Sequence, residues 1–385
     1  MDKLLIGLLG VVLVGLGVFF FIAPALAERQ MNPITRPPRP VSDKAKALHM
    51  QLQTADLHAD SLLWGRDLLQ RSQRGHVDIP RMQAGNHAFQ VFTVVTKTPK
   101  HLNIERNDDQ TDNIALLALA QRWPLATRHS LFERAMYQAG RLTEMASRSN
   151  GDLVLIKTRQ DLEQFITRRK QGAKQVAGLL GIEGAHALDG DLNNLIKLYQ
   201  AGFRLISPSH FFDTDIGGSA HGLQKGGLSE KGLQWLKQME QLGMVVDLAH
   251  ASANTINDVL RLATKPVVVS HTGVKGTCDN NRNLSDQQLA AIARNGGLVG
   301  IGFWDTAVCD DSVEGIAKAM RYTADRIGVQ HVALGSDWDG AVGTPIDVER
   351  LPELTQALLD VGFSENDIQQ IMGENVFRYL LQVLP

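Results

Sequence analysis

The chain has 385 residues, of which 44% are hydrophobic, and a formal net charge of −2. Nucleic-acid binding normally needs a basic surface, so this composition predicts no nucleic-acid partner. The length is sufficient to bury a large core, in one barrel-type domain or in two smaller domains.

The chain begins with an uncharged apolar run from Leu4 to Ala27. A run of this length can cross a bilayer as a single helix. It ends in Ala25-Leu26-Ala27, which has the small-x-small form of a signal-peptidase site. Residues 1–27 are therefore predicted to be a transmembrane anchor or a signal peptide, and the length of the run favours the anchor. Both interpretations predict a membrane-anchored or periplasmic, extracytoplasmic protein.

Residues 28–45 include the proline-rich sequence NPITRPPRP, which predicts an extended linker. Residues 46–385 are predicted to form the remaining domain. Eight apolar runs in it have the length of strands: Leu52–Leu57, Ala88–Val95, Val176–Ile182, Phe203–Ser207, Met244–Leu248, Pro266–Ser270, Gly297–Phe303 and His331–Gly335. Several are almost continuously apolar, which is typical of parallel strands buried on both faces.

Helical patterns separate most of these runs, for example at residues 229–243 and 285–296, and further helical patterns occupy a long spacer at 96–175. The alternation predicts an α/β fold, a distorted (β/α)8 TIM-type barrel with an insertion. The alternative is an open, doubly wound sheet. Such a sheet normally has a glycine-rich phosphate turn after its first strand, and HADSLLW at 58–64 is not one.

Polar side chains follow six of the eight predicted strands. They are His58 and Asp60 after the first strand, Glu183 after the third, His210 after the fourth, His250 after the fifth, His271 after the sixth and Asp337 after the eighth. In a barrel, these strand ends form one rim, where active sites are assembled. Imidazole and carboxylate groups suit zinc, and a carboxylate can bridge two ions, so the pattern predicts a metal site with room for two metals.

Each of these signals is weak alone. A histidine after a strand is more often an ordinary loop residue, and Asp337 and Asp339 could be turn residues. His186 is interpreted as a residue that supports the site. The other histidines are interpreted as structural: His49, His76, His87, His101, His129, His221 and His331. Cys278 and Cys309 could form a disulfide or remain two buried thiols.

Seven segments carry a resemblance to a known family: DLHAD, GIEGAH, SPSHFF, VVDLAHAS, VVVSHTGVKGTCDNNRN, GSDWDG and GENVFRYLL. In this order they resemble the membrane dipeptidases, also called renal dipeptidases (zinc peptidase family M19). The resemblance runs from about Thr54 to Leu381. No single segment is specific, but the set is.

The resemblance implies a distorted (β/α)8 barrel that holds two Zn²⁺ ions. It implies that His58 and Asp60 bind one ion, that His250 and His271 bind the other, and that Glu183 bridges them. Asp337 would then exchange protons with the bridging water and meet the substrate's free amine. His210 would stabilise the oxyanion, and Arg282 would bind the substrate's terminal carboxylate.

The implied activity is the hydrolysis of dipeptides, including those with a C-terminal D-residue, by a hydroxide that bridges the metals. The resemblance also favours a Cys278–Cys309 disulfide and allows a homodimer. Two alternatives are another dinuclear-metal barrel hydrolase (a lactonase, phosphotriesterase or deaminase) and an inactive binding protein on the same scaffold. Many barrels of the first kind bridge their metals with a lysine after the fourth strand, where this chain has His210. The second would lack ligands, and none is missing here.

Overall fold

The structure is a computed structural model that describes residues 3–385. Its strands are β1 (Thr54–Ala59), β2 (His87–Val95), β3 (Leu153–Leu155), β4 (Val176–Glu183), β5 (Phe203–Ile206), β6 (Val245–Val246), β7 (Val268–Thr272), β8 (Leu298–Ile301) and β9 (Val332–Leu334). All are paired in parallel, in the order β6-β5-β4-β2-β1-β9-β8-β7, with β3 beside β4. One parallel bridge between Asp247 and Val268 joins the two ends of this order. The sheet therefore closes, irregularly, into the predicted barrel.

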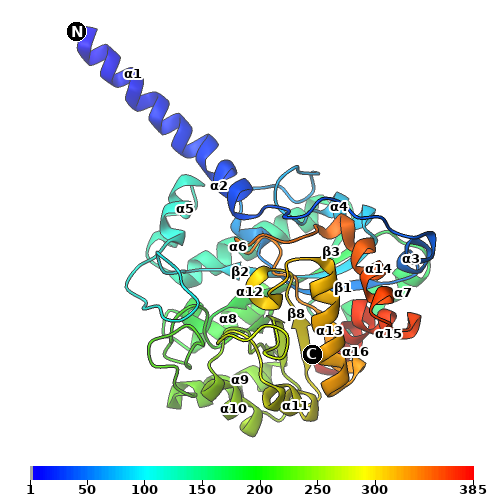
Figure 1. The fold of residues 1–385 in the computed structure, drawn as a ribbon. Coiled ribbons are helices and arrows are strands. Elements are labelled where there is room, and N and C mark those ends of the chain that lie inside the picture. Colours follow the sequence, from blue (N-terminus) through cyan, green and yellow to red (C-terminus); the bar gives the residue numbers. More distant parts are fainter. Residues whose placement is uncertain (1–2) are drawn as a thin grey trace.

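The helices before β4 are α1 (Lys3–Gly17), η1 (Val18–Ile22), α2 (Ala23–Met31), α3 (Asp43–His49), η2 (Ser61–Leu63), α4 (Ile79–Ala84), α5 (Ile114–Ala120), η3 (Leu125–Arg128), α6 (Leu131–Arg148) and α7 (Arg159–Lys170). Those after β4 are η4 (Ala185–Leu188), α8 (Asn193–Ala201), α9 (Glu230–Leu242), α10 (Ala253–Leu262), α11 (Asp286–Arg294), α12 (Asp305–Val308), α13 (Val313–Ile327), η5 (Val329–His331), η6 (Val348–Arg350), α14 (Leu351–Asp360), α15 (Glu365–Gln369), η7 (Gln370–Glu374) and α16 (Asn375–Val383). Most of them lie around the barrel (Figure 1).

All eight predicted strands are present, with ends that differ by a few residues. Sequence analysis missed β3, which has only three residues and pairs with the first half of β4. It also missed α7, whose only buried residues are Leu162 and Phe165, too few for an apolar stripe. Sequence analysis did not predict α13, between β8 and β9. The helices α8, α9, α10 and α11 follow their predicted patterns. Left-handed glycines end two of them, Gly202 after α8 and Gly243 after α9.

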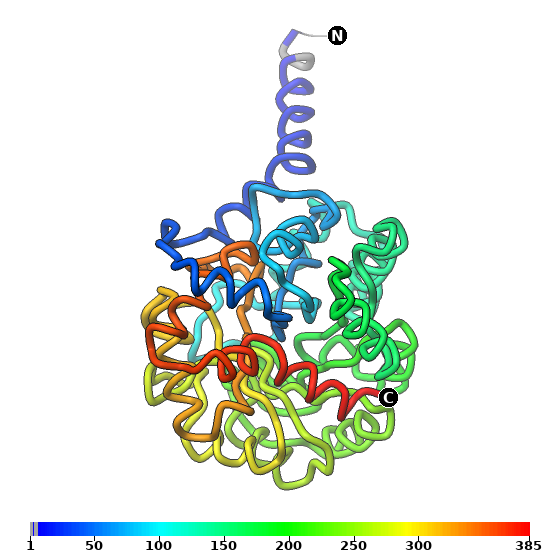
Figure 2. The backbone as a smooth tube through the Cα atoms, turned by 90° about the vertical axis from the view of Figure 1, so that its right-hand side faces the viewer, coloured from blue at the N-terminus to red at the C-terminus, as the bar shows by residue number. Residues whose placement is uncertain are grey.

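The apolar N-terminal run is helical and points away from the barrel (Figures 1 and 2). From Gly7 to Met31 it is long and apolar enough to cross a membrane. The helix continues into α2, which contains Ala25-Leu26-Ala27, lies against the barrel and buries Glu28. The division of the chain at residues 27 and 45 stays a prediction.

Candidate metal centre

The fold brings the polar residues of the strand ends together. His58 lies in β1 and Asp60 directly follows it, Glu183 ends β4, and His271 lies in β7. The remaining members are on the loops after β5, β6 and β9: His210, His250 and Asp337. All seven side chains are buried. The register explains part of this placement, because Glu183 pairs with Val95, the last residue of β2, at the rim of the barrel.

Glu183 is the centre of the cluster. Its Oε1 atom lies 3.2 Å from His58 Nε2, 3.3 Å from His250 Nε2 and 3.4 Å from His271 Nε2. Its other oxygen, Oε2, lies 3.0 Å from His210 Nε2. One carboxylate therefore faces four imidazole nitrogens from four different parts of the barrel.

A second group of donors lies on the β1 side of Glu183. His58 Nε2 is 3.6 Å from Asp60 Oδ1 and 3.9 Å from Asp337 Oδ1. Three sets of residues have ligand atoms close enough to share one ion: His58, Glu183 and His271; Glu183, His210 and His250; and His58, Asp60 and Asp337. The sets overlap at His58 and Glu183, so the donors form one continuous site.

Two loops at the site hold non-glycine residues in left-handed backbone conformations. His250 has a φ of 62° and Asp337 a φ of 61°. Such conformations are uncommon for these residues and are found where a site over-determines the backbone. Beside Glu183 the chain uses glycine: Gly184 has a φ of 91°, and a Cβ there would lie 2.3 Å from Cε1 of His186. The tight turn therefore needs glycine.

Two hydroxyl groups orient the cluster, and sequence analysis missed both. Ser270 Oγ lies 3.1 Å from His58 Nδ1 and 2.9 Å from His271 Nδ1, so it holds two rings through the nitrogens that face away from Glu183. Thr93 Oγ1 donates to Asp60 Oδ1 at 2.6 Å. Thr93 is a polar residue inside the apolar strand β2, and this unusual position is the sequence feature by which it could have been found.

Burial governs the protonation of the imidazoles. Burial, followed by the neighbouring histidines and Arg282, lowers the pKa of His210, His250 and His271 well below the ordinary value, so these rings are neutral near pH 7. Neutral imidazole is the form that binds metals. Burial also acts to lower the pKa of His58, but Glu183 and Asp60 outweigh it and raise that pKa well above its ordinary value.

The carboxyl groups have the opposite shifts. Burial and then the charge of Asp60 raise the pKa of Glu183 to about 7, against the attraction of His58 and Arg282. Burial is also the main cause that raises the pKa of Asp337 well above its ordinary value. Buried carboxylates at this density are costly to ionise unless cations neutralise them.

The donor set fits divalent metal ions. Glu183 Oε1 has no hydrogen-bond partner although it is buried. His250 Nε2 and His271 Nε2 lie 2.9 Å apart, with one proton at most between them. Converging lone pairs of neutral imidazoles and carboxylates are the ligand chemistry of zinc and related ions.

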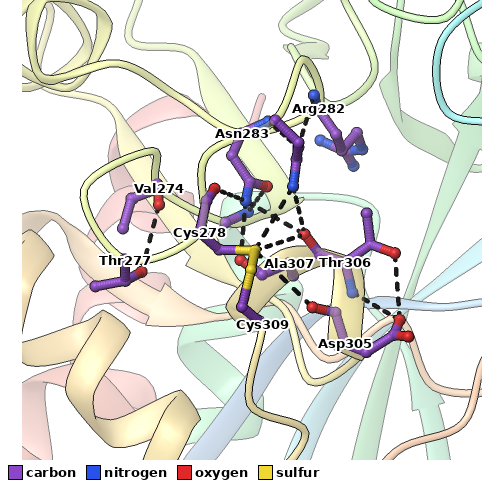
Figure 3. Close-up of a disulfide and its surroundings, with 11 residues drawn as sticks. Val274, Thr277, Cys278, Arg282, Asn283, Asp305, Thr306, Ala307 and Cys309 are labelled. Atoms are coloured by element: carbon purple, nitrogen blue, oxygen red, sulfur yellow. Dashed lines mark hydrogen bonds between the residues drawn. A yellow bond between two sulfur atoms is a disulfide. The ribbon is translucent and has the colours of Figure 1, made fainter.

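Arg282 enters the same site from the loop after β7. Its Nη2 donates to His271 O at 2.7 Å, and burial lowers the pKa of its guanidinium to about 10. The Cys278–Cys309 disulfide is present, with a Cα–Cα distance of 5.3 Å. Figure 3 shows it joining this loop to α12, and Asn283 donates to the carbonyls of Cys278 and Ala307 on the two sides. The loop that carries Arg282 is thus covalently fixed.

A cavity of about 680 Å³ leads to these residues. Its inner wall contains Asp60, Glu183, His210, His250, Arg282 and Asp337. His221, interpreted from the sequence as structural, also lines it. Its ring centroid lies 5.2 Å from that of His250, and its Nδ1 contacts Ile104 O. No strand precedes His221 directly, so the positional signal did not include it. His186, expected to support the site, contacts Phe212 with ring centroids 4.8 Å apart.

Comparison with known proteins places this geometry in a family. The chain is 34% identical over 213 residues to the dipeptidase verJ of Clonostachys rogersoniana, which covers 54% of this chain and 55% of verJ. The chain thus spans about half the length of the curated relatives it matches.

Two solved structures have the same fold. A metallopeptidase from Rhodobacter sphaeroides, liganded with a phosphinate mimic of the dipeptide L-Ala-D-Ala, is 25% identical, with a TM-score of 0.70 over 86% of this chain and 99% of that one. The dipeptidase AC, a metallopeptidase of family M19, is 26% identical, with a TM-score of 0.72 over 86% and 99%. The family model of the membrane dipeptidases, peptidase family M19, matches residues 42–384, so this chain belongs to that family.

Proposed function

We propose that this protein is a dinuclear zinc dipeptidase. The observation that carries the proposal is the position of Glu183, whose two carboxylate oxygens lie 3.0–3.4 Å from the Nε2 atoms of four histidines. Dipeptidases among the relatives and a dipeptide mimic in a structural neighbour support the reaction class.

We assign His58 and Asp60 to one ion, His250 and His271 to the other, and Glu183 to both. Two zinc ions in these ligands would polarise the scissile carbonyl and lower the pKa of the attacking water. Ser270 and Thr93 hold the ligands in place, because they hydrogen-bond to the two rings and to Asp60.

The remaining polar residues of the cavity suit the two ends and the centre of a dipeptide. The planar guanidinium group of Arg282 can donate two parallel hydrogen bonds to the terminal carboxylate. Asp337, whose pKa is raised by burial, can accept and return a proton and can face the substrate's amine. We assign His210 to stabilising the oxyanion. Groups for both termini in one cavity restrict the substrate to two residues, and a D-residue at the second position is included in the proposal.

The decisive experiment is metal analysis of the purified protein combined with a dipeptide panel that includes L-D dipeptides. We expect two zinc equivalents, turnover that a chelator abolishes, and loss of turnover in Glu183→Gln. Lactones and phosphotriesters serve as the competing panel. The cavity lining within residues 3–385 contains no lysine that could act as a bridging ligand. Hydrolysis of a lactone or phosphotriester in preference to every dipeptide would contradict the proposal.

His210 needs a separate experiment, because its ring lies close enough to Glu183 and His250 to share an ion with them. Under our assignment, His210→Gln keeps two zinc equivalents and loses turnover, whereas His250→Gln loses zinc as well. Loss of one zinc equivalent in His210→Gln would make His210 a ligand instead.

For localisation, we propose that the N-terminal helix is a retained anchor with the barrel on the extracytoplasmic side. Residues 25–27 lie within the helix α2, and Ala27 itself lines the cavity. Mass spectrometry of the membrane fraction should find a mature chain that retains residues before Ala27. A homodimer stays a prediction.

A further inference from the structure

The outer half of the cavity differs in chemistry from the inner half. The N-terminal helix supplies one of its walls, with Phe19 of η1 and Ala23, Pro24, Ala27 and Met31 of α2. None of these side chains is charged or carries a hydrogen-bonding group. The metal-centre residues end the cavity on the inside, so a molecule bound there extends from a polar site into an apolar compartment.

A second wall of this compartment is mainly apolar, with Thr98, Asn103 and Asn113 as its polar residues. Leu102 and Ile104 come from the long loop after β2, and Leu116 and Leu117 come from α5. Leu116 is 58% exposed and Leu102 is 42% exposed, so both side chains are open to contact with a bound apolar group. The two walls, α2 and α5, contact each other.

A buried ion-pair network fixes the position of α2. Glu28 is 1% exposed and pairs with the guanidinium groups of Arg66 and Arg74. Arg66 in turn donates to Asp339 Oδ2 at 2.7 Å. Asp339 lies two residues after Asp337, so the network connects the N-terminal helix to the loop of the metal centre.

The segment after α2 makes a second connection to the same loop. Asn32 is buried and its Oδ1 accepts from Ala341 N at 2.9 Å. Thr35 N donates to Thr344 O at 2.8 Å, and Thr344 N donates to Pro33 O at 3.1 Å. The N-terminal helix is therefore held to the barrel in two places, at Glu28 within α2 and through residues 32–35, which follow α2.

From these contacts we propose that the N-terminal helix is one wall of a substrate subsite that receives an apolar side chain of the dipeptide. This inference rests on the proposed function, because the polar ends of the dipeptide are those held by the metal centre. The cavity, at about 680 Å³, lies well within the size range of pockets for drug-sized ligands, roughly 300–1,000 Å³. It thus has room for large side chains, and the enzyme prefers dipeptides that carry them.

The test uses the full chain in lipid nanodiscs, so that no detergent fills the compartment. Ala27→Trp narrows the subsite, and Leu26→Trp is the matched control, because Leu26 is 51% exposed and does not line the cavity. We expect Ala27→Trp to raise KM for Phe-Phe by roughly tenfold or more, with KM for Gly-Gly within about twofold of wild type. Leu26→Trp should leave both unchanged. Ala27→Leu is the smaller substitution to use if Ala27→Trp does not fold.

Equal effects of the Ala27 and Leu26 variants on the ratio of the two KM values would overturn the subsite. Wild-type protein that hydrolyses neither these two nor any other dipeptide of the panel would instead overturn the proposed function. The subsite is then judged by calorimetric binding of phosphinate mimics of Gly-Gly and Phe-Phe. A selective loss of affinity for the larger mimic in Ala27→Trp supports the subsite, and equal affinities in the two variants refute it.

Discussion

Ser270 shows how a single residue outside the ligand set shapes the centre. Its hydroxyl lies between Nδ1 of His58 and Nδ1 of His271, and its backbone N donates to Asp247 Oδ1 at 2.8 Å. A group on Nδ1 leaves Nε2 free to bind an ion and fixes the direction of the ring. One hydroxyl group therefore orients two histidine rings that we assign to different ions.

We expect Ser270→Ala to weaken zinc affinity by roughly 10–100-fold, because both rings lose the partner that orients them. Competition with a chromogenic chelator measures this directly. Ser147→Ala, on the exposed face of α6, is the control and should have wild-type affinity. Unchanged affinity in Ser270→Ala would show that packing alone orients the rings.

The residues that we propose as ligands could be located from the sequence because histidines and carboxylates are rare enough after buried strands to be noticed. Ser270, Thr93 and His221 could not, since a hydroxyl or a lone histidine has meaning only once its partner across the barrel is known. The partners of Ser270, for example, are its neighbour His271 and a residue 212 positions away.

His87 makes stability depend on pH. It is fully buried beside Thr54, and burial lowers its pKa to about 3. The native state therefore keeps His87 neutral, while the unfolded state takes up a proton near pH 6.5. Stability falls as pH drops below about 6.5, by about 1.4 kcal/mol at pH 5.5 from this one residue.

We expect the melting temperature of chelated protein to fall less between pH 7.5 and 5.5 in His87→Gln than in wild type. The other buried histidines titrate in both proteins, so their contributions to the pH dependence of the melting temperature cancel in this comparison. Parallel falls in the two proteins would mean that the imidazole of His87 is already charged in the folded state.

Among the elements, the segment between the two cysteines depends most on a covalent bond. This segment comprises most of the loop after β7, then α11, β8 and α12, and it carries Arg282. Closing a loop of 31 residues removes conformational freedom from the unfolded chain that is worth roughly 3–4 kcal/mol. The bond therefore contributes to stability and also fixes the residue assigned to the substrate's carboxylate.

Replacing both cysteines by serine should lower the melting temperature and raise KM for dipeptides more than it lowers kcat, because Arg282 is assigned to binding. Asn283 still joins the two segments by hydrogen bonds, so the protein should fold. Steady-state kinetics with and without the bond measure the split. A change confined to kcat would place the effect of the disulfide on the metal centre instead.

At this scale, apolar runs predicted the strands well because parallel strands are buried on both faces, whereas β3 and α7 bury too few side chains to leave a pattern. The role of α2 could not be predicted from the sequence for a different reason. Glu28 and Arg66 are ordinary surface residues by sequence, and only the folded chain shows that they pair inside the protein.

Considered as a whole, the molecule is a barrel closed weakly at one side and crowded with charge at one rim. Between β6 and β7 the sheet is joined by a single bridge at Asp247–Val268. The residues that we assign as ligands come from β1 and the position after it, from β4 and β7, and from the loop after β6, so they lie on both sides of that weak junction. Ions shared by these ligands would hold the two sides together.

We therefore expect metal removal to destabilise the entire domain and not only to stop turnover. A ligand that binds only the folded state stabilises it by about 2.7 kcal/mol when present at 100 times its Kd. Chelation should lower the melting temperature by several degrees, and added zinc should restore it. Glu183→Gln provides the control: a variant without the shared ligand should melt at nearly the same temperature with and without chelator. If chelator leaves the wild-type melting temperature unchanged, the barrel is held closed by its own packing and the ions act on catalysis alone.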